Sequence, residues 1–136
     1  MPGYEIKRVA FVVLTILLTS ARHGEAQHVN AKDAPCKTGP NSEKTQCFVA
    51  EAQVADRDLN LAYDKIRKIL SPMDQNKLQI AQRLWVQFRD ANCAAERDLY
   101  DGGSAAPMVY AACLAWDTRQ RARELTVMYG WRLRKK

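Results

Sequence analysis

Four cysteines in a chain that begins like an exported protein constrain this sequence more than any other feature. They are Cys36, Cys47, Cys93 and Cys113. An even number of cysteines behind an export signal is typical of a disulfide framework, and less so of a metal site or a catalytic thiol. We therefore expect two disulfides, each of which would stabilise the fold by roughly 2–4 kcal/mol.

The export signal is predicted over residues 1–26. Lys7 and Arg8 precede an apolar stretch at 9–18, and small residues lie just before Gln27, where we expect the mature chain to begin. The apolar stretch is far shorter than the ~20 residues that span a bilayer. We therefore expect cleavage, no transmembrane span afterwards and a periplasmic or secreted protein, with an uncleaved membrane anchor as the alternative.

The charge balance is basic. Lys and Arg outnumber Asp and Glu by 21 to 15, which gives a net charge of +6. Part of this excess lies in a basic tail at 131–136, which also contains Trp131. Such a tail can contact an anionic envelope surface, either polymer or lipid, and we expect no nucleic-acid partner. A solvated tail without a partner is the alternative.

Turn-forming residues divide the mature chain into segments. Residues 27–40 contain prolines and a glycine, and we expect an irregular lead-in there. Residues 41–130 form the predicted helical domain, with Asn41 or Ser42 as the first cap and Gly130 as the last helix end. Within this domain, breaks are expected at Ser71-Pro72 and at the glycines that follow Asp101.

Apolar residues recur every three or four positions, as they do on one face of a helix. The first predicted helix carries Phe48, Ala52, Ala55, Leu59, Ala62, Ile66 and Ile69. The second carries Leu78, Ala81, Trp85 and Phe88. The third has a less regular pattern. The predicted fold is all-α, an antiparallel three-helix bundle cross-linked by two disulfides, in which the first two helices are direct neighbours because their connection is short.

The same topology brings all four cysteines to one end of the bundle. Proximity alone leaves three pairings open. We favour Cys36–Cys93 with Cys47–Cys113, because this pairing would join the lead-in and both outer helices to the centre.

Arg121 lies on the apolar stripe of the third predicted helix, and a charge in that position needs a partner. Polar residues flank the stripes of the other two helices. We expect a buried network with the members Asp56, Asn60, Arg89, Asp90 and Arg121. Its predicted role is structural, to fix the alignment of the helices. A ligand-binding cluster is the alternative.

Residues for enzyme chemistry are scarce. The mature chain has one histidine, His28, and it falls in the lead-in. A Ser-His or Cys-His nucleophile pair is therefore not expected. Neither a zinc-protease motif nor a glycine-rich phosphate loop occurs. We expect a non-enzymatic protein with no catalytic residues, no metal ligands and no cofactor.

Several short pieces carry a resemblance to a known family. They are Cys36, Cys47, Ala55-Asp56-x-x-Leu59-Asn60-x-x-Tyr63, Gln82-x-x-Trp85-x-x-x-Arg89-Asp90-x-x-Cys93, Gly102-Gly103-Ser104, Cys113 and Thr118-x-x-Arg121-x-x-x-Leu125. In this order they resemble the LprI-like lysozyme inhibitor N-terminal domain family of small exported bacterial proteins. The resemblance implies a helical, disulfide-bonded domain, and lysozyme or another envelope protein as its partner.

If the chain inhibits lysozyme, the glycine-containing loop is the predicted contact. Its residues are Tyr100, Asp101, Gly102 and Gly103. Animal-type lysozymes are strongly basic, so association with another basic protein begins with repulsion unless a local acidic patch offsets it. Glu96, Asp98 and Asp101 are the candidates for that patch. An ordinary connection between two helices is the alternative for this loop.

Overall fold

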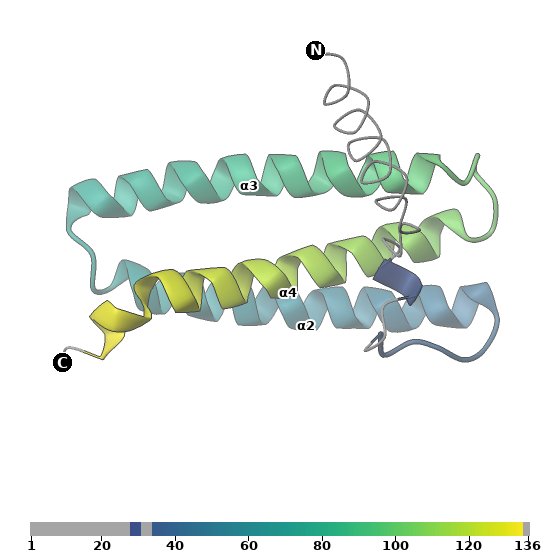
Figure 1. The fold of residues 1–136 in the computed structure, drawn as a ribbon, viewed down its shortest axis with the longest axis horizontal. Coiled ribbons are helices and arrows are strands. Elements are labelled where there is room, and N and C mark those ends of the chain that lie inside the picture. Colours follow the sequence, from purple (N-terminus) through teal and green to yellow (C-terminus); the bar gives the residue numbers. More distant parts are fainter. Residues whose placement is uncertain (1–27, 31–33, 135–136) are drawn as a thin grey trace, which may run out of the picture.

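The computed structural model describes residues 28–30 and 34–134 of the chain, and the predicted signal peptide lies outside these residues. The elements are the short 3-10 helix η1 (His28–Asn30), followed by α2 (Asn41–Arg67), α3 (Pro72–Asp98) and α4 (Ala106–Leu133). The described residues contain no strand. The predicted all-α, three-helix architecture is confirmed, with α3 antiparallel to the other two helices (Figure 1).

The last helix occupies the central position. α4 packs along α2 over much of its length, packs less extensively on α3, and also contacts η1 (Figure 1). The backbones of α2 and α3 approach each other little, so these two helices are antiparallel, as predicted, but each packs mainly on α4. Small buried residues explain why α2 packs on α4. Ala111, Ala112 and Ala115 of α4 allow a close approach of helix axes that larger side chains would prevent.

The connection between α2 and α3 is closed by side chains. Ser71 caps α3, as predicted: its Oγ accepts a hydrogen bond from the Asp74 amide at 3.2 Å, and Pro72 occupies the first turn. Gln75 Nε2 then donates to the carbonyl oxygens of Arg67 and Leu70, both at 3.1 Å. Carbonyls at the end of α2 that lack helical partners are thereby satisfied.

Two other predicted helix ends were wrong. The N-cap residue of α2 is Pro40, which has no side-chain hydrogen bond to the first turn. Asn41 and Ser42, the predicted caps, lie within the helix. The Asn41 amide instead donates to Ser104 Oγ at 3.2 Å, which links the start of α2 to the α3–α4 loop. At the other terminus α4 continues through Gly130 to Leu133, so the first residues of the predicted basic tail are helical.

The core consists of two apolar clusters. One lies near the start of α2 and α4, where Phe48 packs with Cys36, Met108 and Ala112. The other lies toward the opposite end and contains Leu59, Ile66, Leu78 and Leu125. The predicted stripe of the first helix is confirmed, because Phe48, Ala55, Leu59 and Ile66 are buried and its other members are half-buried.

The predicted inward face of α3 is confirmed in part. Phe88 is 66% exposed, whereas Leu78 and Cys93 are buried and Trp85 is half-buried. The inward face of the helix also contains Arg89, whose polar atoms find partners inside the bundle. The predicted stripe was therefore correct at Leu78 and Trp85 and wrong at Ala81 and Phe88, which are exposed.

Both predicted disulfides exist, but their predicted pairing was wrong. The bonds are Cys36–Cys47 and Cys93–Cys113, and no described cysteine is free. Cys47 adjoins Phe48, which points into the core, so the cysteine faces the lead-in and not the interior of the bundle. Cys93 and Cys113 are fully buried where α3 crosses α4, and they bond there.

Candidate functional site

A polar layer separates the two apolar clusters, and Arg89 is its centre. The Arg89 guanidinium donates to Asp90 Oδ1 at 2.8 and 2.9 Å and to Thr118 Oγ1 at 2.9 Å. A longer ion pair of 3.4 Å joins it to Asp56. These contacts link one residue of α3 to both other helices. Since Thr118 is only 1% exposed, Arg89 supplies its side-chain hydrogen bond inside the protein.

Arg121 lies next to this layer but bonds to other residues. Its guanidinium donates to Gln82 Oε1 at 3.1 Å and to Glu124 Oε2 at 3.1 Å. Of the five predicted network members, the structure therefore joins Asp56, Arg89 and Asp90 by direct contacts. Asn60 is exposed on α2 and is not a partner of either arginine.

Trp85 connects the two arginines indirectly. The Arg89 guanidinium lies 5.2 Å from the centre of the indole ring, and that of Arg121 lies 5.7 Å from it. Cations at this distance are attracted to an aromatic face. The motif Gln82-x-x-Trp85-x-x-x-Arg89-Asp90 thus supplies several adjoining contacts on the inward face of α3, a pattern that suits a structural role.

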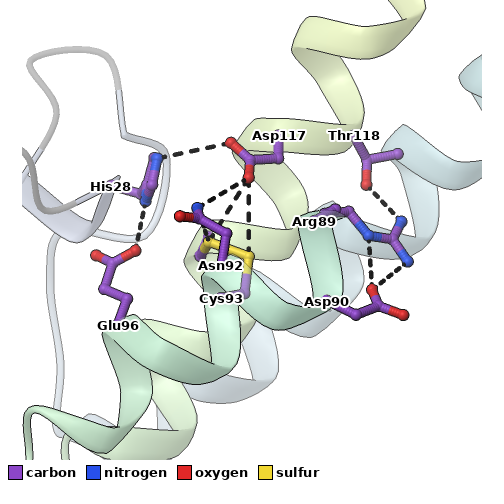
Figure 2. Close-up of a disulfide and its surroundings, with 9 residues drawn as sticks. His28, Arg89, Asp90, Asn92, Cys93, Glu96, Asp117 and Thr118 are labelled. Carbon is purple, nitrogen blue, oxygen red and sulfur yellow. Dashed lines mark hydrogen bonds and ion pairs between the residues drawn. A yellow bond between two sulfur atoms is a disulfide. The ribbon is translucent and has the colours of Figure 1, made fainter. Parts of the chain in front are cut away.

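His28 forms a second polar cluster that sequence reasoning missed. Its Nδ1 lies 2.9 Å from Glu96 Oε2 of α3, and its Nε2 lies 3.8 Å from Asp117 Oδ1 of α4. The ring also lies 5.8 Å from that of Trp116. Figure 2 shows the histidine between these two carboxylates, beside the Cys93–Cys113 disulfide. One residue of the lead-in therefore contacts both helices that the buried disulfide joins.

A signal for this cluster was present in the spacing. Glu96 follows Cys93 by three residues, and Asp117 follows Cys113 by four. Each carboxylate thus lies one helical turn beyond a cysteine and on the same face of its helix. Once the two cysteines bond, the carboxylates must converge and require a cationic or hydrogen-bonding partner. His28 occupies that position.

Asp117 is the titratable group of this cluster that burial affects most clearly. Desolvation raises the pKa of Asp117 above its ordinary value of 3.8, although His28, the Asn92 amide and Arg89 oppose this change. Glu124 contributes a smaller increase in the same direction. A carboxyl group with a pKa raised by folding binds its proton more tightly in the folded state. Its contribution to stability is therefore greatest at acidic pH and declines as the pH rises above 3.8.

The cluster does not offer a complete metal site or an activated nucleophile. Ligand atoms of His28, Cys113 and Asp117 lie within 4.8 Å of one another. The Cys113 sulfur is already bonded to Cys93, so it cannot act as a thiolate ligand or nucleophile. The Asp117 carboxylate lies 3.9 Å from both disulfide sulfurs, and these contacts involve no hydrogen bond because the sulfurs carry no proton. The arrangement suits a structural role, in which His28 holds the lead-in against α3 and α4.

The predicted binding loop is a tight connection at one end of the bundle. Asp101 and Gly102 have positive φ angles of 48° and 72°, and the Gly103 amide donates to the Tyr100 carbonyl at 2.8 Å. A Cβ atom at Gly103 would lie only 3.1 Å from that carbonyl. Positive φ favours glycine at Gly102, and Asp101 adopts such a backbone at some energetic cost. The loop is thereby held in one shape before any partner binds.

The side chains around this loop differ in their accessibility. Leu99 is 79% exposed, and Asp101 is also exposed, whereas Tyr100 is half-buried. Glu96 turns inward to His28 and is not part of an acidic surface patch. Asp98 is exposed but forms an ion pair of 2.8 Å with Arg97. Of the three carboxylates predicted for the patch, Asp101 is thus the one that is exposed and has no ion pair among the described residues.

Two comparisons relate the chain to known proteins. A protein-family model described as "Lysozyme inhibitor LprI" matches residues 34–125, which include all four cysteines and the predicted loop. An uncharacterised protein of Rhizobium meliloti (strain 1021) is 27% identical over 132 residues, and the match covers 87% of this chain and 93% of that protein. No solved structure matches the chain significantly.

Proposed function

Because the chain belongs to the LprI family of lysozyme inhibitors, we propose that it is an exported, non-enzymatic module that binds and inhibits a lysozyme. The match over residues 34–125 is the observation that carries this proposal. It spans more than half of the chain and includes most of the folded bundle. Such a module needs no catalytic residues of its own, because it inhibits the enzyme by obstructing the cleft in which the substrate binds.

Export is consistent with the chemistry of the cysteines. All four are bonded in pairs. Disulfides form and persist in the periplasm or outside the cell, whereas the cytosol keeps most thiols reduced. None of the helices in the described part of the chain is long and apolar enough to cross a membrane. The paired cysteines support a periplasmic or secreted location.

The contact with lysozyme is assigned to the loop at Tyr100, Asp101, Gly102 and Gly103. A loop that is already closed by the Tyr100–Gly103 hydrogen bond loses little conformational entropy on binding. Leu99 offers an apolar side chain beside it, and Asp101 offers a negative charge. A concave site with a basic rim is complementary to both features.

Asp101→Lys is expected to weaken inhibition of lysozyme about tenfold, which corresponds to about 1.4 kcal/mol. The substitution reverses the exposed charge at the proposed contact. The inhibition constant for hydrolysis of peptidoglycan by a basic lysozyme provides the measurement. Asp58→Lys is the matched control, because Asp58 is an exposed carboxylate on α2 and its substitution changes the net charge equally. If both variants inhibit equally well, the loop assignment is incorrect.

A second candidate function is association with an anionic envelope surface through the end of α4. The last turns of this helix expose Val127, Met128 and Trp131, and Arg132 and Arg134 follow at the same end. Apolar side chains next to cations are typical of segments that lie on anionic membranes. This observation favours lipid over a soluble polymer as the anionic partner.

Arg132→Glu combined with Arg134→Glu is expected to reduce binding to anionic vesicles at least tenfold, since each basic residue near such a surface contributes about 1 kcal/mol. Substitution is preferable to deletion because Leu133 packs on the second apolar cluster. Co-sedimentation with vesicles at low and high salt gives the readout. Arg57→Glu combined with Arg83→Glu is the control, since both residues are exposed elsewhere. Equal loss in the two double variants would indicate an effect of net charge alone.

A further inference from the structure

The outer face of α3 carries a continuous row of exposed apolar residues. Phe88 is 66% exposed and Leu84 is 61% exposed, and Met73, Ile80 and Leu99 extend the row in both directions. Small residues complete it, because Ala91 and Ala95 are also exposed. This outer row consists of Met73, Lys77, Ile80, Leu84, Phe88, Ala91, Ala95 and Leu99. The opposite side of the same helix provides the contacts to α4.

The spacing of the outer row is that of a helix that packs against another helix. Successive members are three or four residues apart, the separation that keeps side chains on one face. In Figure 1, α3 lies at the edge of the bundle, with α4 on one side of it. A contiguous apolar face of this kind is uncommon on a monomeric soluble protein and typically marks an interaction surface.

We propose that the outer row binds α3 of a second copy of this chain, with the two helices antiparallel about a two-fold axis near Gln87 and Phe88. In this arrangement Lys77 of one copy lies opposite Asp98 of the other. Two identical ion pairs result, one at each end of the contact. Lys77 is 68% exposed and Asp98 is 66% exposed, and each has a partner on its own helix, Asp74 at 3.7 Å and Arg97 at 2.8 Å. Exposed ion pairs of this kind are weak, so the contact between copies can share or exchange them.

Side-chain sizes are also self-complementary in this alignment. Leu84 lies opposite Ala91 of the second copy, and Ile80 lies opposite Ala95. Each large residue therefore meets a small one, which allows two helices to interdigitate closely. From Lys77 to Asp98 the contact would extend about 32 Å along each helix. The two Phe88 side chains would meet near the centre, where large aromatic groups contribute most to association.

The charges beside the row favour a second copy over an anionic membrane. Lys77 and Arg83 are near its first half, and Asp98 is near its end, so both signs are present along one helix. A membrane-binding face would be expected to carry basic residues along its length. An antiparallel copy instead brings Lys77 to Asp98 twice, which is the isologous contact of a two-fold dimer.

The first test compares Leu84→Arg with Leu61→Arg. Both leucines are exposed, at 61% and 59%, but Leu61 lies on α2 and outside the outer row. Molar mass is measured by sedimentation equilibrium over a range of protein concentrations. We expect a dimer for the parent protein and for Leu61→Arg, and a dimer dissociation constant at least 100-fold higher for Leu84→Arg. Circular dichroism checks that all three proteins remain helical.

The second test examines the antiparallel alignment. Lys77→Glu alone places two carboxylates opposite each other at both ends and is expected to weaken dimerisation. Combining it with Asp98→Lys reverses each ion pair and is expected to restore dimerisation to within a few-fold of the parent. This recovery depends on the two positions facing each other and would not follow from a change in folding alone.

Three results would overturn the proposal. The parent protein could remain monomeric at millimolar concentration, Leu84→Arg could dimerise as well as the parent, or the charge reversal could fail to restore the dimer. If the parent is monomeric and Leu84→Arg loses inhibition of lysozyme or binding to vesicles, the outer row binds that partner and not a second copy. The loop variant Asp101→Lys is expected to keep the dimer, so this test and that of the proposed function can fail separately.

Discussion

Replacing Cys93 and Cys113 together by alanine is expected to lower the free energy of unfolding by about 2–5 kcal/mol. Both residues are fully buried, and their bond joins α3 to the central helix. α3 packs less extensively on the bundle than α2 does, so it depends more on a covalent link. For a domain with a total stability of about 5–15 kcal/mol, this is a large fraction. Urea denaturation measures the change.

The matched comparison is the alanine replacement of Cys36 and Cys47. That disulfide closes a shorter segment, with a sequence separation of 11 against 20, and it joins the lead-in to exposed Cys47. Its removal is expected to cost less, and hydrogen exchange should then increase mainly in the first turns of α2. If removing this pair lowers the free energy of unfolding more than removing Cys93 and Cys113 does, the disulfide to α3 is not the more stabilising of the two.

Arg89→Ala is expected to destabilise the protein by about 2–3 kcal/mol, the range for a hydrogen-bonded charge that leaves a buried partner unsatisfied. Its removal would deprive Thr118 of its donor and Trp85 of one stacked cation. Arg121→Ala is expected to cost only about 1 kcal/mol, because Glu124 is 57% exposed and can be hydrated. Thermal and urea unfolding of both variants provide the test. A greater loss from Arg121 would place the centre of the polar layer elsewhere.

Structural features were predicted correctly from the sequence where local residue types determine them. The phase of the α2 stripe was correctly predicted from Phe48, Leu59 and Ile66, although Val49, Val54 and Leu61 of the same helix are exposed. The Ser71-Pro72 start of α3 was equally clear because local chemistry determines a cap. The loop before α4 could be located from its paired glycines.

Hydrophobicity predicted the inward face of α3 only in part, at Leu78 and Trp85, because the helix has apolar residues on two opposite sides. Phe88 and Leu84 lie outside, while Arg89 and Glu96 face inward, where Thr118 and His28 are their partners. Arg89 was expected in a buried network, but the sequence pattern did not identify its partner Thr118, which comes from another helix. Arg121 was identified as a charge that needs a partner, but its actual partners, Gln82 and Glu124, come from contacts that periodicity does not encode.

The disulfide connectivity bears on how the protein matures. Each cysteine is bonded to the next one along the chain, Cys36 to Cys47 and Cys93 to Cys113. A polypeptide that crosses a membrane from its N-terminus delivers these thiols in the same order, so the native partner of Cys36 is also the first one it meets. Closing the shorter loops costs less chain entropy than joining distant cysteines. If the chain is exported as proposed, we expect oxidation during translocation to favour the native bonds without a disulfide isomerase.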